Sequence, residues 1–401
     1  MNNAFIIDGI RTPIGNFGGM LATTRPDDLA ALVIKTLVQR NPAIDVQEIY
    51  GVLMGCANQA GEDNRNIARM ALLMAGLPLR IPGETINCLC ASGLSAAIIA
   101  ARTIQTGDAA LMIAGGVESM TRGPWVISKT TTPFGRDAQM FDSSFGWRFI
   151  NPLLKQIYGV DTMGETAENL AAQYHISREH QDAFAYRSHQ KAAKAQAGGR
   201  FNQEIIGVSV AQKKGDATIF TNDEFIKPGT TLELLAKLRT AFAEKGTVTA
   251  GNAAGLNDGA AALLLASSQA VKQYQLKPLA RIVASGIAGV EPRIMGIGPV
   301  PAAAIALKKA GLTMADMDLI ELNEAFAAQS LACLRSWNIA DDDTRVNPNG
   351  GAIALGHPLG MSGARILLTA ALELQLQQKK FALITMCVGV GQGYAVIIER
   401  M

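Results

Sequence analysis

The sequence has few charged residues and almost no excess of either sign. In 401 residues, 36 Lys and Arg stand against 34 Asp and Glu, which leaves a formal net charge of +2. A chain so nearly neutral creates no global field that could hold a nucleic acid or an anionic membrane. We therefore expect neither partner, and any anionic ligand must be met by a local patch of charge.

Long apolar runs are also missing. The longest, such as residues 260–266, are far shorter than the roughly 20 residues that a bilayer-spanning helix needs. Residues 1–13 have neither a basic start nor a long apolar stretch, so they indicate a strand and not a signal peptide. Five cysteines, an odd number in a chain without a secretion signal, favour free thiols over a disulfide framework. We expect a soluble, cytoplasmic protein in which a thiol is available for catalysis.

Aromatic residues are scarce at 5%, whereas hydrophobic residues make up 49% of the chain and glycines number 40. This composition is typical of a well-buried α/β enzyme and excludes a disordered or fibrous protein. At 401 residues the chain is longer than one hydrophobic core usually allows. Two compact domains or two fused halves are therefore expected.

The beginning and the last third of the chain repeat the same order of apolar runs and small-residue helices, although few residues are identical. In the first copy we predict strands and helices alternating at 4–8, 28–39, 49–54, 91–102 and 111–116. The second copy repeats them at 280–284, 302–310, 316–322, 362–374 and 381–387. This duplication predicts mixed sheets covered by helices, with active groups at strand ends and helix starts where the two halves meet.

A polar, helix-rich insertion interrupts the first copy, and residues 252–267 then supply its final strand pair. We therefore divide the chain into three parts. The N-terminal half takes residues 1–120 and 250–271, the inserted loop domain takes 121–249, and the C-terminal half takes 272–401.

Three of the four histidines lie in this insertion and do not suggest a metal site. His175, His180 and His189 occur within 168–196 among Gln, Arg, Glu and Lys, the pattern of a solvated amphipathic helix. Their spacing matches no standard ligand motif. The C-x-C pair at 88–90 has no second pair of cysteines or histidines at a suitable interval. We expect no metal.

The first candidate for chemistry is Cys90, in the segment 87–93 between a predicted strand and a helix of small residues. Backbone N–H groups and the dipole at a helix start stabilise a thiolate and lower its pKa, which makes the thiol a nucleophile. The alternative is that Cys88 and Cys90 are small core residues. Spacing by itself leaves both interpretations open.

Two further candidates lie among glycines near the carboxy terminus. His357 occurs in the glycine- and proline-rich run 347–360, where a special backbone lets another element approach closely, as a base beside a nucleophile requires. Cys387 follows an apolar strand in 387–393, where a thiol can serve as acid or base and glycine N–H groups can stabilise an oxyanion. A structural histidine and a buried core thiol are the alternatives.

The glycines after Cys387 do not form a nucleotide loop. They lack the G-x-G-x-x-G spacing, the segment after them is a predicted strand, and the chain has no P-loop. Asn323, at the end of another predicted strand, could orient a water, although an Asn there is more often a cap or turn residue.

Together these segments resemble the thiolase family, and the resemblance runs from Arg11 to the carboxy terminus. The matching segments, in the order of the family, are 11–15, 87–93, 115–120, 249–252, 323–326, 356–358 and 387–391. The resemblance implies a thiolase-like α/β fold: two similar βαβαβαββ halves with mixed five-stranded sheets and an inserted loop domain.

The resemblance also implies roles for the candidate residues. Cys90 would be the nucleophile that carries the acyl group, and His357 would be its activating base. Cys387 would be the acid or base at the α-carbon of the substrate, and Asn323 would hold a water. Gly389 would join the Cys90 backbone in an oxyanion hole.

For ligands, the resemblance implies a 3-oxoacyl-CoA and free coenzyme A, the latter as co-substrate, with no permanently bound cofactor. Its expected neighbours are Met163, Lys227, Ala250, Ala254 and Phe326. Ala254 replaces a serine that is frequent in the family, so one hydrogen bond to pantetheine is expected to be missing. The resemblance also implies a homotetramer, a dimer of dimers.

Within the family, segments 55–64 and 140–169 are similar to the degradative thiolases that cleave 3-oxoadipyl-CoA to succinyl-CoA and acetyl-CoA. Gly164 departs from the proline common in that subgroup. Arg148 is a candidate partner for the terminal carboxylate, with a surface ion pair as the alternative. Acetyl-CoA acetyltransferase and medium-chain 3-ketoacyl-CoA thiolase are the alternative activities.

Two other classes share this architecture. Decarboxylating ketoacyl synthases pair the nucleophile with a second histidine or asparagine, and Cys387 argues against them. A non-enzymatic acyl-binding relative would be favoured if a catalytic position were replaced, and none is.

Overall fold

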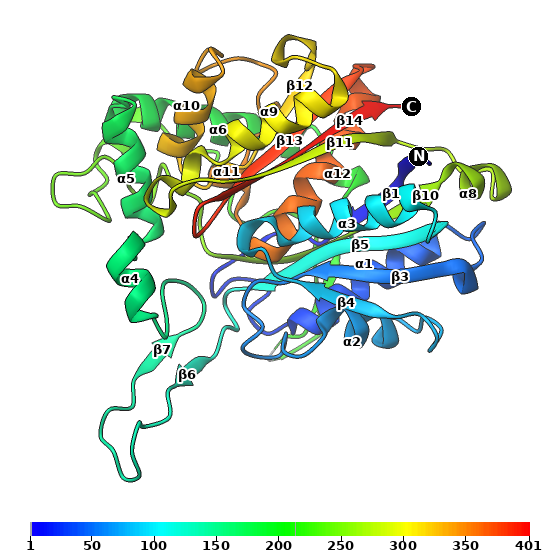
Figure 1. Cartoon of the computed structure of the whole chain (residues 1–401), viewed down its shortest axis with the longest axis horizontal. Helices are drawn as coiled ribbons and strands as arrows, with labels where there is room; N and C mark the ends of the chain where they lie inside the picture. The colour runs from blue at the N-terminus through cyan, green and yellow to red at the C-terminus, as the bar shows by residue number, and fades with distance from the viewer. Residues whose placement is uncertain (1, 213) are drawn as a thin grey trace.

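A single mixed sheet forms the centre of the computed structural model, which describes residues 2–212 and 214–401. Across these residues the sheet has ten strands in the order β12-β13-β14-β11-β1-β10-β5-β3-β4, and β2 pairs with β10. Helices cover both faces (Figure 1). No described helix is long and apolar enough to cross a membrane.

The first half of the molecule, as we use the term, consists of the elements before residue 120 together with β10 and α8. Its strands are β1 (Ala4–Arg11), β2 (Gly15–Asn16), β3 (Ile49–Gly55), β4 (Gly83–Ile86), β5 (Leu111–Ser119) and β10 (Asn257–Ser267). Its helices are α1 (Pro26–Arg40), α2 (Ile67–Met74), α3 (Ser92–Thr106) and α8 (Ser268–Gln273), with short 3₁₀ turns η1 (Val46–Glu48) and η2 (Leu89–Ala91). The expected final strand pair is in fact one strand, β10, because residues 252–256 form no strand and Ala253 makes only an isolated bridge to Phe326.

The second half begins with β11 and repeats this plan. Its strands are β11 (Ala280–Gly289), β12 (Leu319–Leu322), β13 (Phe381–Val388) and β14 (Gln392–Arg400). Its helices are α9 (Pro299–Ala310), α10 (Ala327–Ser336), α11 (Ala352–Leu355) and α12 (Leu359–Gln377), with 3₁₀ turns η4 (Pro292–Ile297) and η5 (Met314–Asp316). Residue Val346 contributes only an isolated bridge to Ile320 where a fifth strand would lie.

The two expected sheets are hydrogen-bonded into one. Strand β1 pairs antiparallel with β11 through Phe5–Arg281 and Ile6–Ala280, so the halves share an edge. Sequence periodicity predicts each strand but not this pairing, because the two strands lie far apart along the chain.

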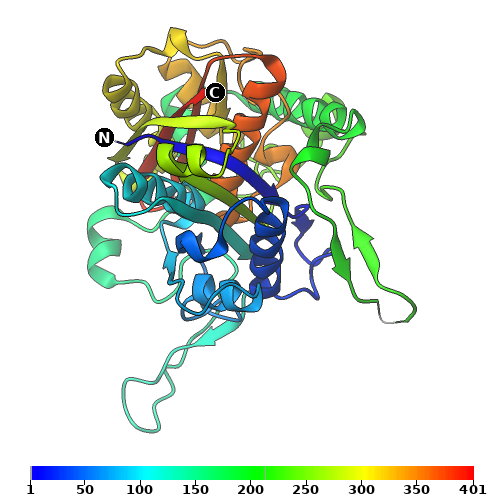
Figure 2. The same cartoon turned by 90° about the vertical axis from the view of Figure 1, so that its right-hand side faces the viewer.

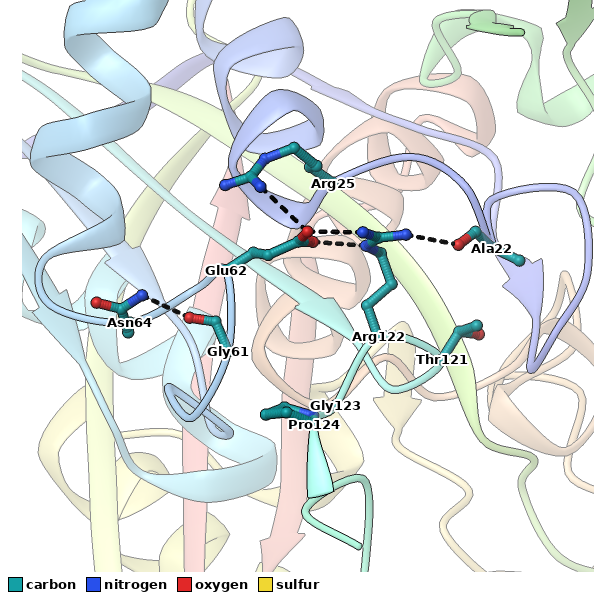
Figure 3. Close-up of a pocket in the computed structure, with 9 residues that line it drawn as sticks. All are labelled: Ala22, Arg25, Gly61, Glu62, Asn64, Thr121, Arg122, Gly123 and Pro124. Atoms are coloured by element: carbon teal, nitrogen blue, oxygen red, sulfur yellow. Dashed lines mark hydrogen bonds and ion pairs between the residues drawn. The ribbon is translucent and has the colours of Figure 1, made fainter. Parts of the chain in front are cut away.

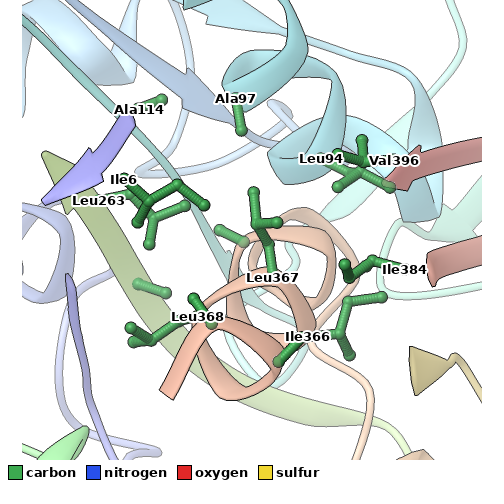
Figure 4. Close-up of a cluster of buried hydrophobic side chains, with 14 of the residues drawn as sticks. Ile6, Leu94, Ala97, Ala114, Leu263, Ile366, Leu367, Leu368, Ile384 and Val396 are labelled. Carbon is green, nitrogen blue, oxygen red and sulfur yellow. The ribbon is translucent and has the colours of Figure 1, made fainter. Parts of the chain in front are cut away.

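Two central helices, α3 and α12, pack against each other and against the sheet. The side chains that α3 and α12 bury are small or branched aliphatic ones, such as Leu94, Ala97, Leu367 and Leu368 (Figure 4). Glycine makes the approach close: a Cβ placed on Gly93 would lie 2.6 Å from the carbonyl oxygen of Gly360. The wealth of glycine and the scarcity of aromatics thus follow from helices that pack backbone to backbone.

The inserted segment, residues 121–249, contains two hairpins, which extend from different sides of the molecule (Figure 2). Its strands are β6 (Trp125–Ile127), β7 (Met140–Asp142), β8 (Val208–Val210) and β9 (Thr218–Phe220). Its helices are α4 (Pro152–Tyr158), α5 (Met163–Gln173), α6 (Arg178–Ala197) and α7 (Leu232–Ala236), with the 3₁₀ turn η3 (Arg200–Gln203). The β6–β7 hairpin projects away from the body (Figures 1 and 2).

The single solvated helix expected over 168–196 is wrong in two respects. The chain forms two helices, α5 and α6, because His175 adopts a positive φ of 51° between them. His189 is buried, and burial lowers its pKa to about 4. Sequence polarity misjudged this face because α6 packs against α10 and α11 of the second half.

A buried ion network ties the inserted segment to β1. The Arg11 guanidinium contacts Glu204 at 2.8 Å and Asp223 at 2.7 Å, and all three side chains are excluded from solvent. Asp223 also accepts the N–H of Ile14 at 2.8 Å. Such groups are stable together only because each charge has its partner.

We predict that Arg11→Met lowers the free energy of unfolding by about 3–5 kcal/mol, because the buried Asp223 loses its cation and the buried Glu204 keeps only Arg200. Chemical denaturation measures it. Arg281→Met is the matched control, since its partner Glu399 is partly exposed, and it should cost about 0–1 kcal/mol. Equal losses in the two variants would contradict the expectation.

Candidate active site

The turn that carries Cys90 lies between β4 and α3. Leu89 takes a positive φ of 49°, and its N–H donates to Asn87 Oδ1 at 3.0 Å. The Ser92 hydroxyl donates to the Leu89 carbonyl at 2.6 Å, which closes the turn into the helix. Cys90 is half-buried there, and its turn packs against α12 and β13.

Burial raises the pKa of Cys90 to about 11, although the N–H groups of Gly389 and of Cys90 itself lower it. The expectation that the helix start lowers the pKa is therefore wrong in its net sign, because loss of water outweighs the N–H groups. The same N–H groups still face the sulfur, so they can stabilise negative charge once it forms. Cys90 therefore rests as a neutral thiol, which would need a base to act as a nucleophile.

Cys387 lies at the end of β13 and is 1% exposed. Burial raises its pKa well above the usual value, and the neighbouring sulfurs of Cys90 and Cys333 raise it further. The structure therefore brings the thiols of Cys90 and Cys387 close enough to influence each other. Gly389, two residues later, faces Leu89: a Cβ there would lie 3.1 Å from Leu89 Cδ1.

His357 is fixed at both its backbone and its ring. Its N–H donates to Asn257 Oδ1 at 2.9 Å. The Ser362 hydroxyl gives its one proton to the Pro358 carbonyl at 2.8 Å, so it must accept at its 2.6 Å contact with His357 Nδ1. The proton is thus on Nδ1, and Nε2 carries the free lone pair.

The imidazole is also kept neutral. Burial, together with the smaller effect of the positive charge of Arg365, lowers the pKa of His357 to about 3. Arg365 is itself buried in α12, 4.0 Å from Glu321. A neutral ring with a lone pair on Nε2 is the form that can accept a proton from a thiol.

Asn323 lies directly after β12 and faces this ring. Its Nδ2 donates to His357 Nε2 at 3.4 Å, a long contact. Its Oδ1 is buried and has no hydrogen-bond partner among the described residues. Because a buried carbonyl oxygen without a donor is costly, the position fits a water or ligand group that donates to it.

The expected coenzyme A neighbours form a continuous surface beside this centre. Met163 packs near Gly389, and a Cβ on Gly389 would lie 3.7 Å from Met163 Sδ. The Phe242 ring fills the space beside Gly164. It packs edge to face on Phe326, with the ring centres 6.2 Å apart. Phe326 bridges in turn to Ala253.

The same surface continues to Lys227. Ala254 donates its N–H to the Ala325 carbonyl at 3.0 Å, and Gly255 packs against the Phe225 ring. Lys227 Nζ lies 4.9 Å from the centre of that ring. Lys227 and Ala250 are both exposed. The surface thus has an apolar floor, and at one end lies the Lys227 ammonium, which forms no ion pair with the described residues.

Arg148 is half-buried, and it forms no ion pair with the described residues. Its guanidinium donates to the Ser143 carbonyl at 3.2 Å and to Asn58 Oδ1 at 3.4 Å. Asn58 follows β3 and lies beside Ala57, whose carbonyl accepts from Asn87 Nδ2 at 3.0 Å. The ion-pair alternative is therefore wrong, and the cation lies near the Cys90 turn with its charge uncompensated.

Sequence reasoning missed three residues that support this centre: Asn257, Ser362 and Glu118. Asn257 and Ser362 fix His357, and Glu118 accepts N–H groups from both halves. Only Glu118 had a signal, because it occurs in the matching segment 115–120. The others lie in ordinary strand or helix positions whose partners are set by folding.

A separate open groove of about 650 Å³ lies between the first turn of α1 and the start of the β6–β7 hairpin (Figure 3). Glu62 crosses it and pairs with Arg25 and Arg122. None of the expected catalytic or coenzyme A residues lines it. Both arginines are paired with carboxylates, since Arg25 also contacts Asp27, and we do not include the groove in the candidate site.

Comparisons with known proteins agree with this geometry. The models for the thiolase N-terminal and C-terminal domains match residues 4–269 and 276–400. A beta-ketoadipyl-CoA thiolase of Acinetobacter baylyi is 57% identical over 401 residues, 100% of both chains. A 3-oxoadipyl-CoA/3-oxo-5,6-dehydrosuberyl-CoA thiolase of Escherichia coli K12 is 58% identical, also over 100% of both chains.

The fold is also similar to that of a relative whose structure has been solved. Human mitochondrial 3-ketoacyl-CoA thiolase in complex with CoA has a TM-score of 0.92 and 41% identity, over 100% of this chain and 98% of that one. The expected α/β fold class and family are confirmed. The chain belongs to the thiolase family.

Proposed function

We propose that this protein cleaves 3-oxoadipyl-CoA with coenzyme A to give succinyl-CoA and acetyl-CoA, through an acyl group on Cys90. The observations that carry the mechanism are two. The thiols of Cys90 and Cys387 are close enough to influence each other, and the Cys90 turn packs against α12, directly after His357, whose neutral imidazole has its lone pair on Nε2. The substrate is supported by the names of the relatives that are 57% and 58% identical over the whole chain.

In the first step His357 Nε2 takes the proton of Cys90 as the sulfur attacks the 3-oxo carbon. The N–H groups of Gly389 and Cys90 hold the oxyanion that forms. The bond between carbons 2 and 3 then breaks, and Cys387 gives its proton to the departing α-carbon. The enolate oxygen is held by the newly protonated His357 and by a water on Asn323, which leaves acetyl-CoA and acyl-Cys90.

In the second step the Cys387 thiolate takes the proton of incoming coenzyme A. The coenzyme A sulfur attacks the acyl carbon, and the Cys90 thiolate leaves and recovers its proton from His357. Both thiols return to the neutral form in which they began. The high pKa values of Cys90 and Cys387 suit this cycle, because each group holds its proton until the reaction requires it.

Coenzyme A would lie on the surface from Met163 to Lys227. Phe326 and Ala254 would contact the apolar pantetheine arm, and the exposed Lys227 ammonium would meet a phosphate. The arm would then lead to Gly389 and the two thiols. Loss of coenzyme A affinity in Lys227→Ala, with Cys90 acylation intact, is what this placement requires.

We predict that Cys387→Ala is still acylated on Cys90 by a reactive acyl-CoA but turns over at least about a hundredfold more slowly, the usual effect of losing an acid-base group. Mass spectrometry of peptides locates the acyl group, and a coupled assay gives turnover. Cys333→Ala is the control, because Cys333 is a buried thiol bonded to the Gly296 carbonyl. Near-normal turnover in Cys387→Ala would refute the assignment.

The 3-oxoacyl-CoA substrates have identical reacting atoms. The residues that contact the acyl end must therefore distinguish them. A six-carbon acyl group with a terminal carboxylate needs a cation, and Arg148 supplies one that no described carboxylate occupies. Its contact with Asn58 Oδ1 holds the guanidinium beside the turn that supports Cys90. We propose Arg148 as the carboxylate partner.

We predict that kcat/KM for 3-oxoadipyl-CoA exceeds that for acetoacetyl-CoA by at least about tenfold, the effect of one interaction of about 1.4 kcal/mol in the transition state. 3-Oxohexanoyl-CoA, of equal length without the carboxylate, should be similarly disfavoured. Arg148→Met should remove this difference, whereas Arg136→Met, an exposed charge on the projecting hairpin, should leave it.

The panel also separates the alternative activities. Equal or better use of acetoacetyl-CoA would favour an acetyl-CoA acetyltransferase, and preference for 3-oxohexanoyl-CoA a medium-chain thiolase. Release of carbon dioxide, or product formation without added coenzyme A, would favour a decarboxylating synthase.

We also propose a homotetramer built as a dimer of dimers. Support comes from the projecting β6–β7 hairpin, which exposes Trp125, Phe134 and Met140 to solvent. Large apolar side chains gathered on one surface favour burial against another chain. Light scattering should give the mass of four chains, and a single-chain mass would refute the proposal.

We place the enzyme in the cytoplasm because its five cysteines are all free and the mechanism uses two of them as thiols. Fractionation of the source cells tests this location.

A further inference from the structure

Glu118, near the end of β5, binds both halves of the molecule with one carboxylate. Its Oε2 accepts the N–H of Ala57 at 3.0 Å and that of Gly360 at 2.9 Å. Its Oε1 accepts the N–H of Asn58 at 3.1 Å. The carboxylate therefore joins the turn after β3 in the first half to the first turn of α12 in the second.

One side of this junction leads to the nucleophile. The carbonyl of Ala57 accepts from Asn87 Nδ2 at 3.0 Å, and Asn87 Oδ1 accepts from Leu89 N–H at 3.0 Å. Leu89 has a positive φ of 49°, a conformation that a non-glycine residue keeps only when its surroundings hold it. Cys90 is the next residue, so its direction depends on this chain of contacts.

The other side leads to the base. Gly360 is three residues beyond His357 and lies in the first turn of α12, where a carboxylate is favoured by the free N–H groups of the helix. A side chain at residue 360 would collide with the Val117 carbonyl, so the backbone lies tight against β5. Glu118 thus fixes the start of α12 and, with it, the position of His357 relative to Cys90.

Neither a metal site nor a paired cation explains why this carboxylate is buried. Cys56, Asp63 and Glu118 place ligand atoms within 4.8 Å of one another, but both carboxylates already accept N–H groups of the surrounding turns. The charged or titratable neighbours that influence it are Asp63, Cys56 and Cys90, and no cation contacts its carboxylate among the described residues. A buried carboxylate held only by backbone N–H groups is a link between chain segments.

We propose that Glu118 is a positioning residue that aligns the Cys90 sulfur with His357 through Asn87 on one side and Gly360 on the other. The proposal rests on the proposed function only in its assignment of nucleophile and base. It assigns Glu118 no contact with substrate. Loss of the Glu118 carboxylate should therefore slow the reaction of Cys90 without weakening the binding of coenzyme A.

The test compares Glu118→Gln with the wild-type enzyme by two readouts. One is the rate at which iodoacetamide alkylates Cys90 at neutral pH, followed by peptide mapping, which requires no substrate. The other is steady-state thiolysis with coenzyme A varied. Since displacement of reacting groups by about 1 Å costs about a hundredfold, we expect both the alkylation rate and kcat to fall at least about tenfold. KM for coenzyme A should stay within about twofold.

Asn87→Ala keeps the test decisive if Glu118→Gln does not fold, because Asn87 is exposed. It should slow Cys90 alkylation as Glu118→Gln does. The double variant should be no slower than the slower single variant within about threefold, since both act through one chain of contacts. Asp63→Asn is the control: it perturbs the same turn but does not touch α12, and should keep the wild-type rate.

Wild-type alkylation and turnover in folded Glu118→Gln and in Asn87→Ala would overturn the proposal. So would an equal loss in Asp63→Asn, since the effect would then be general loosening of the turn. Failure of the wild-type enzyme to cleave any 3-oxoacyl-CoA would instead reject the proposed function. The alkylation rates would still decide the role of Glu118.

Discussion

The molecule depends on the contact of backbone with backbone where α12 begins against α3 and β5. Gly93, Gly116 and Gly360 have no side chains to separate these elements, and the carbonyl of Gly360 occupies the space that a Cβ on Gly93 or Gly116 would need. The Cys90 turn and the His357 turn belong to different halves. They lie close together because the elements that carry them pack this closely. The high glycine content is a consequence of this junction.

Burial gives the centre a second property, which is that its reactive groups rest uncharged. It raises the pKa of both thiols and lowers that of His357 to about 3, so protons stay on sulfur and off Nε2. Charge then arises only during the reaction, opposite N–H groups already held in place. Preorganised donors of this kind stabilise a transition state without further rearrangement.

In the function we propose, the inserted segment would supply part of the surface on which a long acyl-CoA lies. Phe242 and Lys227 come from this segment, whereas Phe326 comes from the second half. The buried Arg11, Glu204 and Asp223 network fixes the segment to the first half. In the function we propose, substrate choice and chemistry would therefore belong to separate parts of the chain that the fold brings together.

Much of this protein was determined by its sequence. Alternating apolar runs predicted the strands and helices, and the segments around Cys90, His357 and Cys387 predicted the family and its reactive groups. These features are local, since each depends on residues within one turn or strand. The family resemblance then supplied the roles that spacing alone left open.

Tertiary structure decided the rest, because it depends on residues far apart in the chain. The pairing of β1 with β11 merged two expected sheets into one, and packing on the second half buried His189. The sign of the Cys90 pKa shift followed from burial, which a helix start does not reveal. The tautomer of His357 depends on Ser362 and Pro358, and its backbone on Asn257, a hundred residues away. A pattern of residue types fixes what each segment forms, and only folding fixes which groups meet and how much water remains around them.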